Sequence, residues 1–163
     1  MAFDTRQLRN AFGQFATGVC VATATAEDGQ PFGMTINSFS SVSLSPALVL
    51  WSVQNDSTQT PAWLAARHYG ISVLAEDQQA ISNYFATPGD RHVRSDVLFM
   101  GSEGVPLIDN AKAQFVCRVV DRIAAGDHTI LLGEVMAMNT PRPEALPLLF
   151  FAGQYRDIAP KSE

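Results

Sequence analysis

The alternation of apolar and polar residues along the chain predicts a protein built mainly of β-strands. Strand segments are rich in β-branched and aromatic residues, or alternate apolar with polar side chains. The predicted strands are Val19–Ala24, a strand from Pro31 into the segment Gly33–Leu44, Ala47–Gln54, His68–Ala75, Ala113–Ile123, His128–Met138 and Pro147–Tyr155. The near-continuous apolar run of Ala47–Gln54 indicates burial on both faces of that strand.

Short turns connect several of these strands. Glu27–Gln30 has Asp-Gly at its centre and is predicted as a hairpin-type turn. Ala124–Asp127 joins the two longest predicted strands into a β-hairpin. Gly and Pro punctuate Ala86–Asp96, which is predicted as a loop, and Gly101–Asn110, which is predicted as turns between strands.

Helical spacing of apolar residues is confined to short segments. Asp4 begins a capping arrangement ahead of apolar residues on one helical face, which predicts a helix over Thr5–Phe15. Pro61 suits the first position of a second helix with Thr60 as its cap, and Gln78–Phe85 is predicted as a third. Because strands outnumber helices and short turns join them, the pattern favours an antiparallel barrel over a doubly wound sheet.

Composition indicates one globular domain over residues 1–163, a length that suffices for a single hydrophobic core. Apolar residues make up 47% of the chain and charged residues 17%, which indicates an apolar face hidden in a partner subunit and hence a homo-oligomer. The net charge of -5 argues against a nucleic-acid partner, which would require a basic surface.

Two cysteines, Cys20 and Cys117, lie inside apolar runs, so we expect buried, reduced thiols in a cytosolic protein; a disulfide between them is the alternative. The N-terminal residues lack the apolar core of a secretory signal, and no apolar run approaches the length of a membrane span. We therefore expect a soluble, cytoplasmic protein without a membrane partner.

The candidate ligand-binding residues are concentrated in Gly33–Leu44, which combines an amide with five hydroxyl side chains and has almost no charge. These residues are Thr35, Asn37, Ser38, Ser40, Ser41 and Ser43. Amides and hydroxyls both donate and accept hydrogen bonds, so together they suit the edge of a flat, polar heterocycle. The competing interpretation is a polar turn without a ligand.

Two further segments have both a functional and a structural interpretation. Ser52 and Gln54 share one side of a predicted strand and lead into a hydroxyl-rich loop, which either binds a phosphate or caps the following helix. The loop Ala86–Asp96 contains Arg91, His92 and Arg94, which either fold over phosphates or are solvated. The sequence has no glycine-rich dinucleotide fingerprint, no Cys or His cluster at metal spacing and no serine elbow.

The order and spacing of several segments resemble the flavin reductase family, the small NAD(P)H-dependent reductases that supply reduced flavin to a separate monooxygenase. The segments are FATGV, GMTINSFSSVSLSPALVL, NDST, the pair FAT and DR, AGDHTILLGEV and PLLFFAGQY, and the resemblance extends from about Phe12 to Tyr155. The resemblance implies a mainly β fold with flanking helices. It also implies a six-stranded antiparallel split β-barrel of the FMN-binding type, working as a homodimer with flavin in a groove near the subunit boundary.

The resemblance also implies the site. His128, in the Gly-Asp-His turn, would lie beside the nicotinamide as the catalytic residue; from position alone a lone histidine is usually a surface residue. The cofactor-binding residues would be Thr35, Ile36, Asn37, Ser38, Ser40, Ser41, Ser52, Gln54, Ser57, Thr58, Phe85, Arg91 and Tyr155, and no metal is expected. Among these, Ser57 and Thr58 would lie by the flavin phosphate, and Phe85 and Tyr155 would be walls of the nicotinamide pocket.

The expected activity is hydride transfer from NADH or NADPH to FMN or FAD, with the reduced flavin passed to a partner monooxygenase. The alternative is a flavin-binding or redox-sensing split-barrel protein without turnover. A related oxidase or haem-handling barrel is a weaker possibility, because the sequence lacks a basic phosphate clamp and an axial-ligand signal.

Overall fold

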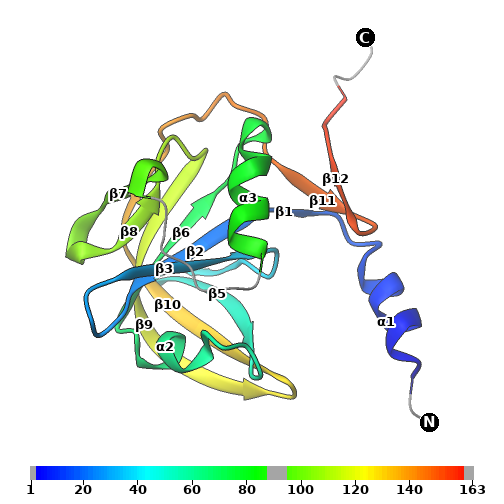
Figure 1. Ribbon diagram of the computed structural model, residues 1–163, viewed down its shortest axis with the longest axis horizontal. Helices are drawn as coiled ribbons and strands as arrows, with labels where there is room; N and C mark the ends of the chain where they lie inside the picture. Colours follow the sequence, from blue (N-terminus) through cyan, green and yellow to red (C-terminus); the bar gives the residue numbers. More distant parts are fainter. Residues whose placement is uncertain (1–2, 88–94, 160–163) are drawn as a thin grey trace.

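The structure, a computed structural model, describes residues 3–87 and 95–159. Its main element is a strongly curved seven-stranded sheet with strand order β3-β2-β6-β9-β10-β5-β4, in which every neighbouring pair is antiparallel. Two small sheets, β7-β8 and β1-β11-β12, lie beside it (Figure 1). The predicted mainly β, antiparallel split-barrel class is confirmed, although the main sheet has seven strands rather than six.

The strands of the main sheet are β2 (Cys20–Thr25), β3 (Pro31–Ile36), β4 (Ser40–Leu44), β5 (Ala47–Gln54), β6 (His68–Val73), β9 (Ala113–Ala125) and β10 (His128–Asn139). The small sheets comprise β1 (Thr17–Gly18), β7 (Leu98–Met100), β8 (Pro106–Ile108), β11 (Leu149–Phe151) and β12 (Gln154–Arg156). The helices are α1 (Thr5–Phe12), α2 (Thr60–Ala65) and α3 (Gln79–Ala86), with short 3₁₀ turns η1 (Glu76–Gln78), η2 (Ser95–Val97) and η3 (Ser102–Gly104).

The core of the barrel is aromatic. Trp51 on β5 meets Trp63 of α2 edge to face at a centroid separation of 4.8 Å and Tyr69 of β6 at 5.9 Å. All three rings are almost completely buried, and edge-to-face contacts of this kind add to the stabilisation from burial. Helix α2 therefore closes one end of the barrel because its tryptophan fills the interior.

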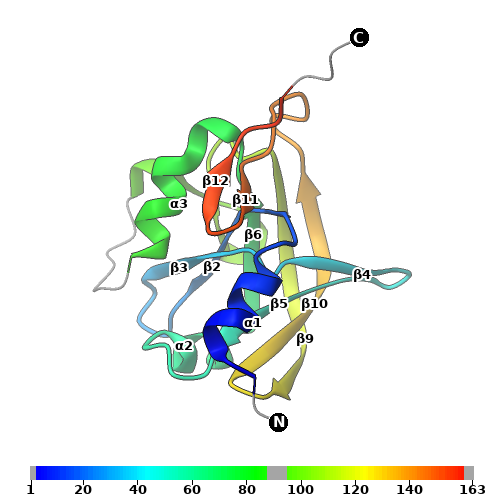
Figure 2. The same ribbon diagram turned by 90° about the vertical axis from the view of Figure 1, so that its right-hand side faces the viewer.

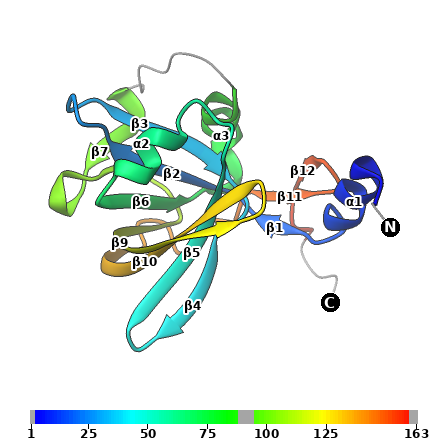
Figure 3. The ribbon, with the colours of Figure 1, turned by 90° about the horizontal axis from the view of Figure 1, so that it is seen from below.

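Two parts of the chain extend away from this core. The β4–β5 hairpin extends from the barrel as an arm (Figures 2 and 3). Helix α1 is amphipathic but has no buried residue, and it stands beside the β11–β12 hairpin (Figures 1 and 2). Phe12, Phe15, Val42 and Leu44 are consequently exposed. Helix α3, in contrast, packs against β3 and places Phe85 in a second buried cluster.

Most predicted elements are confirmed, with the first helix ending at Phe12 rather than Phe15. The single final strand is wrong: Ala152 and Gly153 have φ of 51° and 78° and form a turn between β11 and β12. Gly101–Asn110 was predicted only as turns, yet Pro106–Ile108 is a buried strand paired with β7. Its apolar residues are too few to give a recognisable period.

Two local predictions at β5 and α2 are also wrong. Along β5 the residues Val49, Trp51 and Val53 are buried and alternate with partly exposed ones, so only one face is in the core. Thr60 is the first helical residue rather than the cap, and its hydroxyl donates to the carbonyl oxygen of Gln54 at 2.6 Å. Both cysteines are free and buried, which excludes the alternative of a disulfide. Within residues 3–87 and 95–159, no helix is long and apolar enough to cross a membrane.

A close approach between Gly133 and Tyr69 gives the first testable prediction. A Cβ at Gly133 would overlap the phenol oxygen of Tyr69, whereas a Cβ at Gly18 would meet no atom within 4 Å. Because overpacking a core usually costs about 1–3 kcal/mol, Gly133→Ala should lower the free energy of unfolding by that amount in urea denaturation. Gly18→Ala is the matched control, and adding Tyr69→Phe to Gly133→Ala should restore part of the loss. Equal stability of the two Gly→Ala variants would contradict this packing.

Candidate functional site

The break between β3 and β4 is held against β5 by one hydroxyl group. Ser38 Oγ accepts a hydrogen bond from the backbone N–H of Ser52 at 3.1 Å and lies 3.4 Å from the Ser52 carbonyl oxygen, to which it donates. This double contact fixes the segment Asn37–Phe39 beside the middle of β5. Asn37 itself is exposed and presents its amide outward from this fixed position.

The pairing of β5 with β10 brings His128 to the same edge. Gln54 is the register partner of His128, and Ser52 is the partner of Ile130. Two residues along a strand correspond to about 7 Å, so Ser52 and Gln54 present a short row of polar groups that ends at His128. The sheet therefore brings together residues from three separate segments of the sequence: Ser38, the pair Ser52 and Gln54, and His128.

His128 is held by its neighbour in the turn. Its Nδ1 lies 2.7 Å from Oδ1 of Asp127. The hydrogen bond and the charge of His128 hold the pKa of the Asp127 carboxyl below its ordinary value. The carboxylate thus restrains the imidazole through one nitrogen, which leaves Nε2 as the nitrogen that can act on a ligand.

The loop between β5 and α2 is tied to this same turn. Asn55 Nδ2 donates to the carbonyl oxygen of Gly126 at 3.3 Å, and Asn55 Oδ1 accepts from the Thr129 hydroxyl at 2.8 Å. Ser57 Oγ accepts from the backbone N–H of Gln59 at 3.3 Å, whereas Thr58 is exposed. Helix α2 has only six residues, so its dipole is not expected to bind an anion. The groups available to an anion at this end of the site are the hydroxyls of the loop.

A second group of residues surrounds a cavity of about 180 Å³ between β3, α3 and the β11–β12 hairpin. Thr35 Oγ1 donates to the carbonyl oxygen of Ser82 at 2.6 Å, and the Ser82 hydroxyl lies 2.7 Å from the Tyr155 hydroxyl. The cavity is lined by Val19, Thr35, Ile36, Asn37, Ser82, Ala86, Phe150 and Tyr155. Asn37 therefore borders both groups of residues.

The remaining predicted residues lie elsewhere. Phe85 is 1% exposed, and a Cβ at Gly33 would meet its ring at 3.1 Å, so it supports β3 from beneath and is not among the cavity-lining residues. Ser40 and Ser41 are exposed on the arm, where Ser40 Oγ donates to the Ser41 carbonyl oxygen at 3.1 Å. Arg91 lies outside the described residues.

Sequence reasoning missed four residues that support these groups: Ser82, Asn83, Asn55 and Asp127. Ser82 and Asn83 are on a helix whose apolar pattern gives no reason to single out a serine. Asn55 was treated only as part of a polar loop, although its side chain links that loop to the turn of His128. The Gly-Asp-His motif did contain a signal for Asp127, because an acidic neighbour restrains a histidine.

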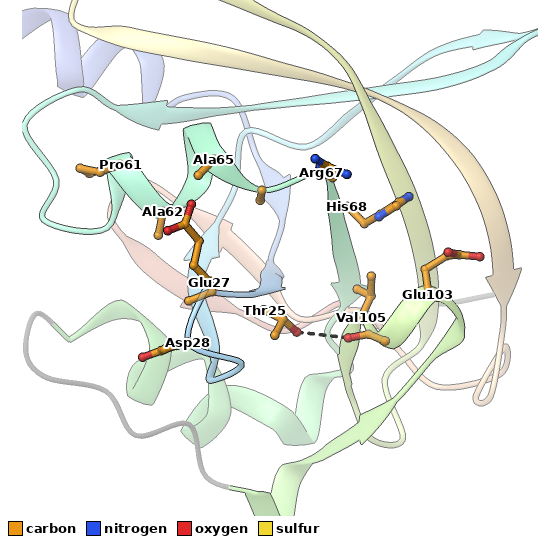
Figure 4. Close-up of a pocket in the computed structure, with 13 residues that line it drawn as sticks. Thr25, Glu27, Asp28, Pro61, Ala62, Ala65, Arg67, His68, Glu103 and Val105 are labelled. Atoms are coloured by element: carbon orange, nitrogen blue, oxygen red, sulfur yellow. Dashed lines mark hydrogen bonds between the residues drawn. The ribbon is translucent and has the colours of Figure 1, made fainter.

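A larger hollow of about 840 Å³ lies apart from all predicted site residues. It is formed by the β2–β3 turn, α2, the start of β6 and the segment around η3, where the Thr25 hydroxyl donates to the Gly104 carbonyl oxygen at 3.1 Å (Figure 4). Glu27, Asp28 and Glu103 contribute carboxylates to its lining, opposed by Arg67 and His68. Three carboxylates disfavour a phosphate-bearing cofactor, so the smaller cavity beside Asn37 is the better candidate.

Within the described part of the chain, no group of three or more His, Cys, Asp or Glu side chains could hold a metal ion. The site consists of hydroxyl and amide groups together with a single histidine. Such groups satisfy the carbonyl and N–H groups of a neutral ring without burying an unpaired charge. The arrangement suits the binding of a flat heterocycle better than nucleophilic or metal-assisted chemistry.

The fold and this site define an antiparallel split-barrel protein whose candidate site is rich in hydroxyl and amide groups. Residues 12–159 match the model of the flavin reductase like domain family. The chain therefore belongs to this family, as its sequence motifs had indicated.

Individual relatives agree with this assignment. The FMN reductase (NADH) SmoA of Agrobacterium fabrum is 44% identical over 152 residues, covering 93% of this chain and 85% of the relative. The reductase component of the flavin-dependent trigonelline monooxygenase of Acinetobacter baylyi is 45% identical, covering 80% of this chain but only 42% of that protein. The NADH:FAD oxidoreductase SgcE6 of Streptomyces globisporus, solved with NAD and FAD fragments, has a TM-score of 0.90 at 39% identity, covering 98% and 96% of the two chains.

The contact between Asp127 and His128 predicts a titration change. His128→Ala should raise the pKa of the Asp127 carboxyl toward its ordinary value, because the hydrogen bond that favours the carboxylate is lost. Carboxyl-carbon NMR titration in acid measures this directly. In the unaltered protein the carboxylate persists, and with it the contact, until the pH falls through the lowered pKa.

Asp77 is the internal control for this titration. Its pKa is also lowered, by a hydrogen bond from Arg142 at 3.0 Å, and should not change in the His128 variant. An Asp127 that titrates identically with and without the imidazole would show that the two side chains do not interact in solution.

Proposed function

We propose that this protein is an NAD(P)H-dependent flavin reductase, which transfers hydride from a nicotinamide nucleotide to FMN or FAD. The observation that carries the proposal is the row of neutral groups formed by Ser38, Ser52 and Gln54, which ends at His128. We expect the redox chemistry to come from bound cofactors, which the protein orients. Among the described residues, no group of three or more His, Cys, Asp or Glu side chains could hold a metal ion.

The donor set fits a flavin ring. The pyrimidine edge of isoalloxazine alternates carbonyl acceptors with an N–H donor, and amides and hydroxyls can match both kinds of group. Asn37 is exposed at the point where the chain is pinned to β5, so it is free to meet that edge. The Ser57 and Thr58 end of the row, at the start of α2, would then receive the phosphate.

When bound, flavin supplies the hydride-accepting ring and the nucleotide supplies the hydride. The protein's own part is to hold two rings in contact, with reacting atoms about 3–3.5 Å apart. His128 acts by position: Asp127 restrains its Nδ1 side, and its other edge orients the nicotinamide or a neighbouring phosphate. Neutral hydrogen bonds favour moderate, exchangeable flavin binding, which suits a product that must leave.

The names of the relatives support particular cofactors and a partner. The Agrobacterium protein is an FMN reductase that uses NADH, and the Streptomyces protein is an NADH:FAD oxidoreductase. The Acinetobacter protein is the reductase component of a monooxygenase. We infer that this chain uses NADH with FMN or FAD and delivers reduced flavin to a separate monooxygenase.

A homodimer is also part of the proposal. Leu44 is 96% exposed and Val42 50% exposed on the projecting arm, while Phe12 and Phe15 are 68% and 78% exposed at the N-terminal helix. Apolar side chains this exposed are expected to be covered by another chain, and a second copy is the simplest partner. A cytoplasmic location is supported by the two buried cysteines, which form no disulfide.

The activity test uses purified protein with NADH or NADPH and FMN or FAD, followed by the loss of nicotinamide absorbance. His128→Ala should slow turnover about 10- to 100-fold, while the flavin dissociation constant changes less than about threefold, because the imidazole serves hydride transfer rather than flavin binding. His68→Ala is the matched control, since His68 lies in the other hollow and should leave the rate unchanged.

The result also separates the two candidate functions. Absence of NADH and NADPH oxidation with either flavin would refute the reductase. Persistent yellow colour without turnover would then favour the alternative, a flavin-binding or redox-sensing protein. Unchanged turnover in His128→Ala would remove His128 from the site.

The dimer gives a separate prediction. Leu44→Glu combined with Val42→Glu should shift the molar mass measured by light scattering from two chains toward one, because charges would replace apolar groups at the proposed contact. Leu64→Glu, at a residue of α2 that is 39% exposed, is the control and should leave the mass unchanged. A wild-type protein with the mass of one chain at micromolar concentration would contradict the proposal.

A further inference from the structure

The cavity of about 180 Å³ beside Asn37 is lined by hydroxyl groups that all donate their hydrogens to other protein groups. Three hydroxyl groups form this polar wall, those of Thr35, Ser82 and Tyr155. Thr35 Oγ1 donates its hydrogen to the Ser82 carbonyl oxygen at 2.6 Å. This hydroxyl can therefore offer a ligand only its lone pairs.

The other two hydroxyl hydrogens are also used within the protein. Tyr155 Oη donates to Asn83 Oδ1 at 3.1 Å, and a carbonyl oxygen can only accept. Since Tyr155 has already given its hydrogen to Asn83, the 2.7 Å contact between Ser82 and Tyr155 requires Ser82 to donate. The hydrogen bonds therefore run in one direction, from Ser82 to Tyr155 to Asn83.

This direction determines what the wall offers to a ligand. Ser82 is completely buried, whereas Tyr155 is partly exposed, so the Tyr155 oxygen is the accessible group of the pair. Because the Tyr155 hydroxyl already donates to Asn83, its oxygen can only accept a hydrogen bond from a ligand. The exposed amide of Asn37 lines the same cavity and carries an NH₂ donor beside its carbonyl.

A ligand that pairs with both of these lining groups needs a hydrogen-bond donor for the Tyr155 oxygen and an acceptor for the Asn37 NH₂. We propose that this cavity selects the amide edge of a flat ring, with its N–H directed to the Tyr155 oxygen and its C=O to the Asn37 NH₂. A carboxylate has no N–H for Tyr155, and a ketone lacks one as well. The inference rests on the proposed function and deepens it by naming Tyr155 as a specificity-determining residue.

Two sources of such an edge are compatible with the chemistry. One is the carboxamide of the nicotinamide ring; the other is the imide edge of isoalloxazine, where N3–H adjoins a carbonyl group. The cavity volume suits one ring or the edge of a larger one, but not a whole isoalloxazine system. Aliphatic and aromatic side chains, Val19, Ile36, Ala86 and Phe150, complete the lining and suit the face of a flat ring.

The experiment compares ligands with and without the N–H in the wild-type protein and in Tyr155→Phe. The nucleotide arm measures KM for NADH and for its reduced 3-acetylpyridine analogue, in which a ketone replaces the carboxamide. The flavin arm measures dissociation constants of FMN and N3-methyl-FMN by fluorescence. Comparing the ratio within each arm between the two proteins cancels the intrinsic differences between the ligands.

One of the two ligand comparisons, nucleotide or flavin, involves the ring edge that binds in the cavity. In that comparison the wild-type protein should bind the ligand with the N–H about tenfold more tightly, the effect of one hydrogen bond. Tyr155→Phe should reduce this preference to less than about threefold. Discrimination in the nucleotide arm assigns the carboxamide, and discrimination in the flavin arm assigns the ring imide. If the phenylalanine variant keeps the wild-type ratios in both arms, or the wild-type protein discriminates in neither, the inference is wrong.

Two controls protect this result. The Tyr155 ring packs edge to face on Phe150 at 5.5 Å, a contact that phenylalanine retains, so the variant should fold. Tyr84→Phe removes a hydroxyl from the same helix as Ser82 but outside the cavity, and should leave both ratios unchanged. A wild-type protein that binds FMN but oxidises neither NADH nor NADPH with FMN or FAD would refute the proposed reductase, while the flavin comparison would still decide the specificity of the cavity.

Discussion

Strand β5 is hydrogen-bonded to β4 along one edge and to β10 along the other, and this double pairing places Ser52 and Gln54 beside Ser38 and His128. Its inward residue Trp51 anchors the strand in the aromatic core, so the strand cannot slip without exposing that ring. The alternate residue Ser52 then faces the Ser38 hydroxyl, and the strand end faces His128. Packing inside the barrel and chemistry outside it therefore depend on the same register.

The sequence was sufficient to predict this framework because its signals are local. The β9–β10 hairpin was identified from two long apolar segments around Ala124–Asp127, and β5 from one apolar run. Structure that depends on distant contacts was not recognisable. Strand β8 has three residues and is stabilised by burial against the main sheet, and the β11–β12 turn requires positive φ at Ala152 as well as at Gly153.

The same distinction applies to the candidate site. Asn37 and Ser38 are in a contiguous polar segment, and Ser52 and Gln54 are alternate polar residues at the end of an apolar run, which made all four visible as hydrogen-bonding groups. Ser82 and Asn83 are single polar residues on a helix, and their relation to Tyr155 arises only when α3 and β12 meet across more than seventy residues of chain. The apolar pattern of the helix does not predict this contact, because a serine in a helix is usually exposed to solvent or caps a helix end.

Hydroxyl groups have two different roles in the candidate site: one fixes a backbone segment, and three others form the polar wall of the cavity. Ser38 holds the chain against β5, which leaves the neighbouring Asn37 amide available to a ligand. The hydroxyl groups of Thr35, Ser82 and Tyr155 donate their hydrogens to acceptors within the protein. The orientation of these hydroxyl groups along the cavity wall is therefore fixed before any ligand binds. The lining of this cavity thus has a defined hydrogen-bonding direction although it includes no charged side chain.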